Sequence, residues 1–214
     1  MDLNKSLIKF LKENKALIAT GQMDTLYDIA YNSVDDPALF IGTMTDAFID
    51  SGIDIASMFK NKLPAYFACA SNMKSFIVPE GIETIGRYAF AYCRKLEHIQ
   101  LPRSLKTIHP AAFKDCMMLD IDLSKTSIGK LWDSCFDSCN FTNIELPDTC
   151  FEIGDGAFYD CTELQSIYIP DSVIKFGDYI FGGDNRNEQF TIECKRGSAA
   201  QRYAKENGFD YYLR

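Results

Sequence analysis

Histidine, tryptophan and unbroken apolar runs are scarce in this chain of 214 residues, which holds two histidines and one tryptophan. No window approaches the roughly 18 apolar residues that a membrane-spanning helix needs. Near the N-terminus, Lys9, Lys12, Glu13 and Lys15 interrupt every apolar run that could form the core of a signal peptide. We therefore expect a cytoplasmic protein, secreted only if a leader has been removed, with no membrane partner.

Positive charge is also in deficit. The chain has 22 Lys and Arg against 30 Asp and Glu, a net charge of −8. Coating a phosphate backbone requires a basic surface, so direct nucleic acid binding is not expected. The charge is uneven along the chain: residues 61–114 hold 8 basic and 3 acidic side chains, whereas residues 115–194 hold 4 and 16. This asymmetry predicts an electric field that steers a charged partner.

Motifs that signal catalysis are missing from the sequence. It contains no phosphate-binding loop, no nucleophile elbow and no paired-histidine zinc motif. His98 falls at an outward strand position, and His109 takes the place of a repeat glycine. We predict no catalytic residue, no metal and no cofactor, and an enzyme is the least favoured function.

An internal repeat begins near residue 76. One column of phenylalanines has spacings of 23, 23, 22 and 23 residues: Phe90, Phe113, Phe136, Phe158 and Phe181. Columns of cysteine, isoleucine and leucine keep the same phase. Within one unit, Ile99 and Leu101 alternate with polar residues and Pro102 follows, which predicts a short strand that ends at the proline. Because a single unit cannot bury its own apolar columns, the units are expected to stack into a solenoid of parallel strands.

The repeat pattern I-x-x-I-G-x-x-A-F-x-x-C-x-x-L-x-x-I-x-L-P is matched at nearly every position by residues 82–102. It resembles the BspA-like leucine-rich repeat family over about residues 63–214. The resemblance implies an α+β solenoid of about five repeats of 22–23 residues. It also implies a C-terminal cap over about 195–214, where Ser198 is the expected helix N-cap and Gly208 the residue that ends the helix. Before the first full repeat, Phe67 is expected in the phenylalanine column.

Residues 1–60 lie outside the resemblance and show helical periodicity. Helices are predicted over 3–18 and 23–34, and a third begins at Asp36 as N-cap with Pro37 as the first helical residue and runs to Asp50. We divide the chain into this helical segment, 1–60, and a solenoid, 61–214. The helices either cap the solenoid or form a separate module that carries specificity.

The eight cysteines suggest packing before redox or metal chemistry. Six of them fall in repeat columns, where a small apolar thiol would be buried, so core thiols are favoured over a disulfide or a zinc site. Cys69 and Cys194, near the two ends, are expected to be the most exposed. The third repeat is irregular, with one residue fewer between Cys116 and Ile121 and one more between Leu123 and Leu131.

The remaining candidate site is the outward face of the strands. Its two rows are expected to run along the solenoid, the first from Ile77 to Thr191 through Tyr168, the second from Ser75 to Gln189 through Ser166. The residues predicted to bind a partner are His98, Gln100, Asp120, Asp122, Asn143, Glu145 and Tyr168.

The function predicted from these features is a non-catalytic module that binds a protein, with the acidic second half docking a basic surface. Two alternatives stay open. One is a small phage or bacterial effector that inhibits a host nucleic-acid-handling or defence protein. The other is a cell-surface adhesin that has lost its leader, since the resembled family includes secreted cell-surface proteins. The sequence gives no signal of oligomeric state.

Overall fold

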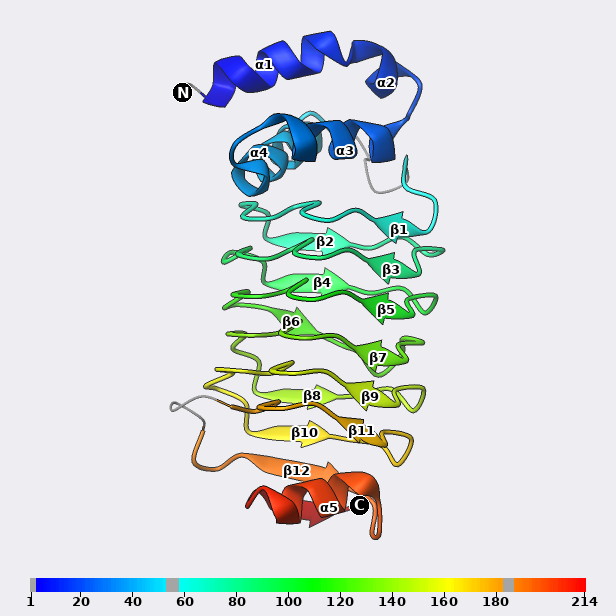
Figure 1. The fold of residues 1–214 in the computed structure, drawn as a ribbon, viewed down its shortest axis with the longest axis vertical. Coiled ribbons are helices and arrows are strands. Elements are labelled where there is room, and N and C mark those ends of the chain that lie inside the picture. The colour runs from blue at the N-terminus through cyan, green and yellow to red at the C-terminus, as the bar shows by residue number, and fades with distance from the viewer. Residues whose placement is uncertain (1–2, 53–57, 183–186) are drawn as a thin grey trace.

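The computed structural model describes residues 3–52, 58–182 and 187–214. Helices stand at the two ends and short strands fill the length between them (Figure 1). The helices are α1 (Leu3–Glu13), α2 (Lys15–Ala19), α3 (Met23–Ser33), α4 (Pro37–Asp50) and α5 (Ala199–Glu206). The strands are β1 (Lys62–Leu63), β2 (Ser75–Ile77), β3 (Thr84–Ile85), β4 (His98–Gln100), β5 (Thr107–Ile108), β6 (Asp120–Ile121), β7 (Lys130–Leu131), β8 (Asn143–Glu145), β9 (Glu152–Ile153), β10 (Ser166–Tyr168), β11 (Lys175–Phe176), β12 (Thr191–Cys194) and β13 (Asp210–Leu213).

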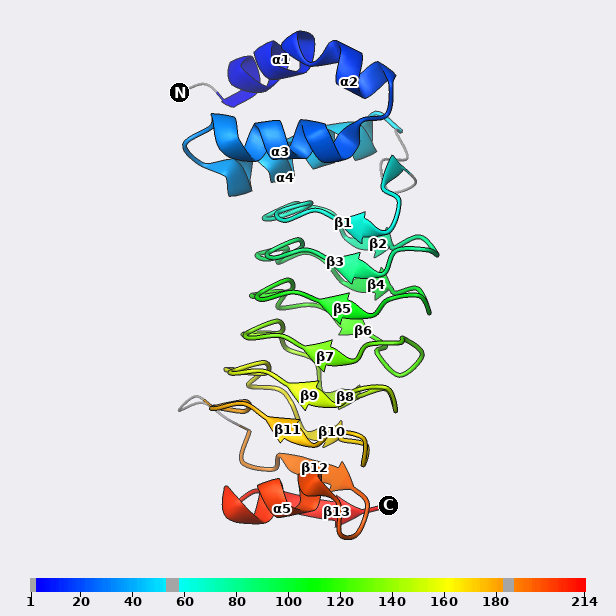
Figure 2. The same ribbon diagram turned by 45° about the vertical axis from the view of Figure 1, so that its right-hand side comes forward.

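Each turn of the solenoid contributes two strands, one to each of two sides of the stack (Figure 2). On one side, β1-β3-β5-β7-β9-β11 form a continuous parallel sheet. On the other, which we call the strand face, β2-β4-β6 form one sheet and β8-β10-β12-β13 another. The predicted parallel solenoid is confirmed. It has about six turns, because β1 pairs with β3 and begins the stack before the first full repeat.

The core follows the repeat columns. Phenylalanine rings from successive turns stack with centroids 5.2 Å apart between Phe90 and Phe113 and 5.4 Å apart between Phe113 and Phe136, and the stack continues through Phe158 to Phe181. One expectation at the start of the stack is wrong. By its hydrogen bonds to the next turn, Ala68 occupies the backbone position of the phenylalanine column, and Phe67 precedes it. The ring of Phe67 still enters the core, where it is fully buried.

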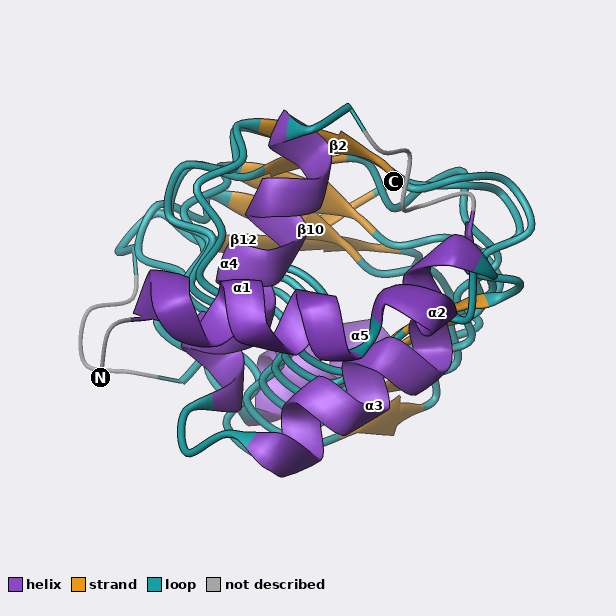
Figure 3. Cartoon of the chain, turned by 90° about the horizontal axis from the view of Figure 1, so that it is seen from above, coloured by secondary structure: helices purple, strands orange, loops and turns teal. Residues whose placement is uncertain are grey.

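The N-terminal helices cover the first turn of the solenoid (Figure 3). The predicted first helix is interrupted at Asn14, whose side-chain amide donates to the carbonyl oxygen of Phe10 and competes with the helical pattern. The start of α4 is as predicted, since the Asp36 carboxylate accepts from the Leu39 N–H. The Tyr27 ring of α3 stacks on Phe67 at 5.9 Å, and the Thr45 hydroxyl of α4 donates to the Phe67 carbonyl oxygen.

The C-terminal segment closes the other end of the solenoid. The Ser198 hydroxyl caps α5 by accepting from the Gln201 N–H at 3.1 Å, as predicted. After Gly208, which has φ +69°, the chain adds the strand β13 beside β12, which the sequence analysis did not predict. This last strand brings Arg214 to the strand face.

Candidate functional site

All seven residues predicted to bind a partner lie on the strand face, around two adjoining hollows. The first hollow has a volume of about 470 Å³ and contains four of them, His98, Gln100, Asp120 and Asp122. The second has a volume of about 390 Å³ and contains Asn143, Glu145 and Tyr168. Asp122 lines both hollows, so the two adjoin, and we call them together the groove.

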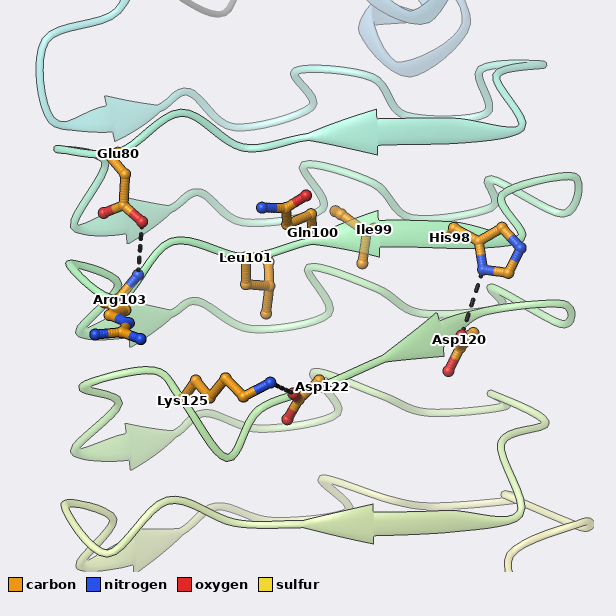
Figure 4. Close-up of a pocket in the computed structure, with 9 residues that line it drawn as sticks. All are labelled: Glu80, His98, Ile99, Gln100, Leu101, Arg103, Asp120, Asp122 and Lys125. Atoms are coloured by element: carbon orange, nitrogen blue, oxygen red, sulfur yellow. Dashed lines mark hydrogen bonds and ion pairs between the residues drawn. The ribbon is translucent and has the colours of Figure 1, made fainter.

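In the first hollow, carboxylates alternate with basic groups (Figure 4). His98 Nδ1 lies 3.3 Å from an Asp120 carboxylate oxygen, and Lys125 Nζ lies 3.2 Å from Asp122. The Ser124 hydroxyl donates to Asp122 at 2.6 Å, and this bond is the main cause of the lowered pKa of Asp122. Asp122 is therefore ionised at neutral pH.

In the second hollow, one guanidinium lies among carboxylates. Arg214 Nε is 2.7 Å from a Glu193 carboxylate oxygen, and its Nη1 is 3.3 Å from Glu145. The guanidinium carbon is 4.5 Å from the centre of the Tyr168 ring. A cation that lies over an aromatic ring and between two carboxylates is stabilised by both kinds of contact. The Arg214 side chain is 46% exposed, so water weakens these interactions.

The predicted end of the first outward row is wrong. Register pairs Tyr168 with Glu193, and Ser166 with Thr191. Thr191 thus belongs to the second row and not beside Tyr168, and Gln189 precedes both rows. The cause is spacing: Ile167 pairs with Ile192, 25 residues later, whereas the earlier steps are of 22 or 23. In the segment from Thr191 to Cys194, apolar residues alternate with polar ones, and Ile192 is buried. This pattern could have identified Glu193 as the outward residue after Tyr168.

Arg214 is the other residue of the groove that sequence reasoning missed. It reaches Glu145 across 69 positions of sequence through β13, and β13 belongs to no repeat column. The first hollow also contains Glu80, Arg103 and Lys125, which lie on the turns beside the strands. The Arg103 N–H donates to the Glu80 carboxylate at 3.3 Å, which joins two successive turns.

The cysteines lie away from this groove, in the core. All eight are free and buried, which confirms the core-thiol interpretation. The expectation that Cys69 and Cys194 would be exposed is wrong, since both side chains have 0% exposure. They are covered by elements that the repeat pattern does not include: α4 packs on the backbone of Cys69, and β13 pairs with the strand of Cys194.

The two histidines lie in different surroundings. The His109 ring stacks on Trp132 at 5.7 Å, and burial, reinforced by Lys62, lowers its pKa. It is therefore neutral at pH 7. His98 is exposed and belongs to the first hollow.

Comparison with known families matches residues 61–188 to the BspA type leucine rich repeat region, in six copies. Comparison with curated proteins gives no match. Within the described residues, no helix has the length and apolar character needed to span a bilayer.

Several solved structures are similar to this chain, among them the following two. A leucine-rich repeat protein from Bacteroides ovatus is 23% identical with a TM-score of 0.50, and the match covers 63% of this chain and 40% of that one. A leucine rich cell surface protein from Faecalibacterium prausnitzii is 29% identical with a TM-score of 0.53, over 63% of this chain and 35% of that one. The matched part is thus well under half the length of either protein.

Proposed function

The chain belongs to the BspA-type leucine-rich repeat family, and from this premise we propose that it is a non-catalytic module that binds a protein through the strand face. One observation carries the proposal: all seven predicted residues line two adjoining polar hollows on this face. Loops and ladders on a rigid repeat scaffold are the usual binding surfaces of such proteins.

The charge of the groove favours a basic partner. The first hollow has carboxylates from Glu80, Asp120 and Asp122 against the cations Arg103 and Lys125, with His98 beside them. The second has Asp122, Glu145 and Glu193 against Arg214 alone. Carboxylates exceed cations in both, so a basic protein surface would be attracted, most strongly at low salt.

A binding role is supported over catalysis by the state of the reactive groups. A thiol acts as a nucleophile in its thiolate form. Burial raises the pKa of the Cys69 thiol to about 12 and that of Cys150 to about 11, which disfavours the thiolate at neutral pH.

The proposal is tested by affinity capture from the native host at low salt, followed by mass spectrometry. The bait is the full chain, compared with a variant in which Asp120, Asp122 and Glu145 are changed to alanine. A second triple variant, with Glu163, Glu188 and Glu206 changed to alanine, makes the same change in charge at exposed carboxylates outside both hollows. The partner should be captured by the wild type and this control, and lost from the groove variant. Equal capture by all three would reject the strand face as the site.

A cell-surface adhesin is the second candidate, favoured by the likeness to the cell surface protein of Faecalibacterium prausnitzii. We propose a cytoplasmic location as the first choice, supported by eight cysteines without a disulfide. Immunodetection of the native protein in cell fractions separates the two. Recovery from the cytosol favours the intracellular binding module, and recovery from the cell surface favours the adhesin.

A further inference from the structure

The strand face is interrupted between the third and fourth full turns. The sheet β2-β4-β6 ends at β6, and the next sheet begins at β8, although β7 and β9 of the same turns remain paired on the opposite side. The space between β6 and β8 is wider than that between the other neighbouring strands of this face (Figure 1). The second hollow, which contains Ile121, Asp122 and Leu123 from one edge and Asn143, Ile144 and Glu145 from the other, lies across this break.

The break originates in the irregular third repeat. Only five positions separate Cys116 from Ile121, against six from Cys93 to Ile99. After β6 the usual proline is replaced by Ser124, which binds Asp122 through both its N–H and its hydroxyl. The chain therefore leaves the ladder after two residues of strand.

The break leaves backbone groups without their usual partners. After β8 and β10, the residue that follows the strand donates its N–H to the next turn: Leu146 to the Tyr168 carbonyl at 3.1 Å, and Ile169 to the Glu193 carbonyl at 2.9 Å. Among the described residues, Leu101 after β4 makes no such bond to Asp122, although β4 and β6 are paired. In the described part of the chain, no corresponding bond runs from Leu123 to Glu145. Two strand edges with free donors and acceptors thus face one groove, and an exposed edge can pair with an added extended peptide.

One arginine of the chain, Arg214, already occupies the second hollow. The Arg214 guanidinium lies over Tyr168, between Glu145 and Glu193, at the end of the groove next to the break. With Arg214 removed, the second hollow would hold three carboxylates and an uncovered aromatic ring. A guanidinium from another chain could make the same contacts.

We propose that the break between β6 and β8 binds an extended, arginine-bearing peptide segment of the partner, and that an arginine of this segment displaces Arg214 from Tyr168. The inference rests on the proposed function and specifies its partner, an extended segment in place of a folded basic surface. Arg214 then competes with the ligand from within the chain, so its removal should tighten binding.

The test measures fluorescence anisotropy with a labelled Thr-Arg-Thr-Arg-Thr peptide at low salt, using the full chain. Arg214→Ala should bind the peptide about three- to tenfold more tightly than the wild type, the gain expected from removing the partly exposed ion pairs of Arg214 with Glu145 and Glu193 and its cation–π contact with Tyr168. Arg94→Ala is the matched control, because Arg94 pairs with Asp115 at 2.5 Å and lines neither hollow. Arg94→Ala changes the net charge by the same amount as Arg214→Ala but leaves the groove unaltered. The affinity of this control for the peptide should therefore stay within about twofold of the wild type.

Backbone pairing is tested separately with the same peptide N-methylated at alternate amides. This peptide should lose at least about tenfold in affinity, since several backbone hydrogen bonds are removed. In hydrogen exchange, binding of the unmodified peptide should slow the amides of Leu123 and Asn143. Arg214→Ala binding no tighter than Arg94→Ala, undiminished binding of the N-methylated peptide, or no peptide binding at all would each overturn the proposal. Partner capture that still depends on Asp120, Asp122 and Glu145 would then leave the proposed function standing.

Discussion

Each cysteine of the repeat column places its thiol against a carbonyl oxygen of the preceding turn. The Sγ–O distances are 2.9 Å for Cys93, 3.1 Å for Cys116, 3.0 Å for Cys139 and 3.1 Å for Cys161. The thiol is thereby a small core side chain with a satisfied donor, which explains its recurrence at this position. Burial raises the pKa of Cys161 to about 12, and the other column thiols shift in the same direction.

The thiols should therefore be unreactive in the folded protein. With Ellman's reagent at pH 8, we expect no prompt reaction in the native state, because the thiolate is disfavoured and the sulfur is inaccessible. In guanidinium chloride all eight thiols should react. Prompt labelling of Cys69 or Cys194 in the native protein, identified by mass spectrometry, would contradict the burial found at the ends of the solenoid.

Burial could be predicted residue by residue wherever a column repeats, but some backbone conformations could not. Tyr88 and Ser134 adopt positive φ values of 56° and 52° two residues before the column phenylalanine, and only Gly156 at the same position signals this. The stacked turns impose a conformation that these side chains disfavour. A sequence pattern does not reveal such a constraint.

At Gly42, the helix α4 lies close against the backbone of the first turn of the solenoid. A methyl group on Gly42 would lie 1.9 Å from the Cys69 carbonyl oxygen, which is far inside contact distance. The fully buried Thr45 lies on the same side, one turn further along α4, with its hydroxyl bonded to the Phe67 carbonyl. Gly42 is thus needed for close packing against the first turn.

Gly42→Ala should lower the free energy of unfolding by about 3 kcal/mol, the upper part of the usual overpacking range, although alanine favours a helix. Thr43→Ala, in the same helix but half-buried, is the control and should change stability by less than about 1 kcal/mol. Chemical denaturation monitored by circular dichroism gives both values. An unchanged midpoint for Gly42→Ala would show that α4 does not pack on the solenoid in this way.

Elements were predictable where local chemistry marks their ends. Asp36 and Pro37 fix the start of α4, and the repeat columns fix the strand register through the fourth full turn. β13 was not predictable, because it follows the C-terminal helix and has no column to join. Because β13 was not predicted, Arg214 could not be assigned to the groove. The position of the groove could therefore be predicted from the sequence, but the ion pairs of Arg214 with Glu145 and Glu193 could not.

For the whole molecule, stability depends on how the two ends of the stack are covered. A solenoid without caps exposes the apolar side of its terminal turns. At the N-terminal end, Leu63 and Phe67 are fully buried in one core with Leu26 and Ile41 of the helices. These contacts favour the cap over a separate module as the role of residues 1–60, and we propose the cap.

Deletion of residues 1–60 tests this role. The remaining chain should melt at least about 10 °C lower than the full chain and bind a dye for exposed apolar surface, because its first turn loses its cover. Differential scanning calorimetry and dye fluorescence measure the two effects. A truncated chain with the original melting temperature would favour the separate specificity module.

A strand-face groove that binds a basic partner should lose affinity both with added salt and with loss of its carboxylates. The most direct test is the Kd of the purified, captured partner, measured by calorimetry at several salt concentrations for the wild type and for the Asp120, Asp122 and Glu145 triple alanine variant. Wild-type affinity should fall steeply with salt, and the variant should bind at least about tenfold more weakly at low salt, with a flatter salt dependence. Equal affinities and equal salt dependence for the two proteins would contradict binding of the partner at this groove.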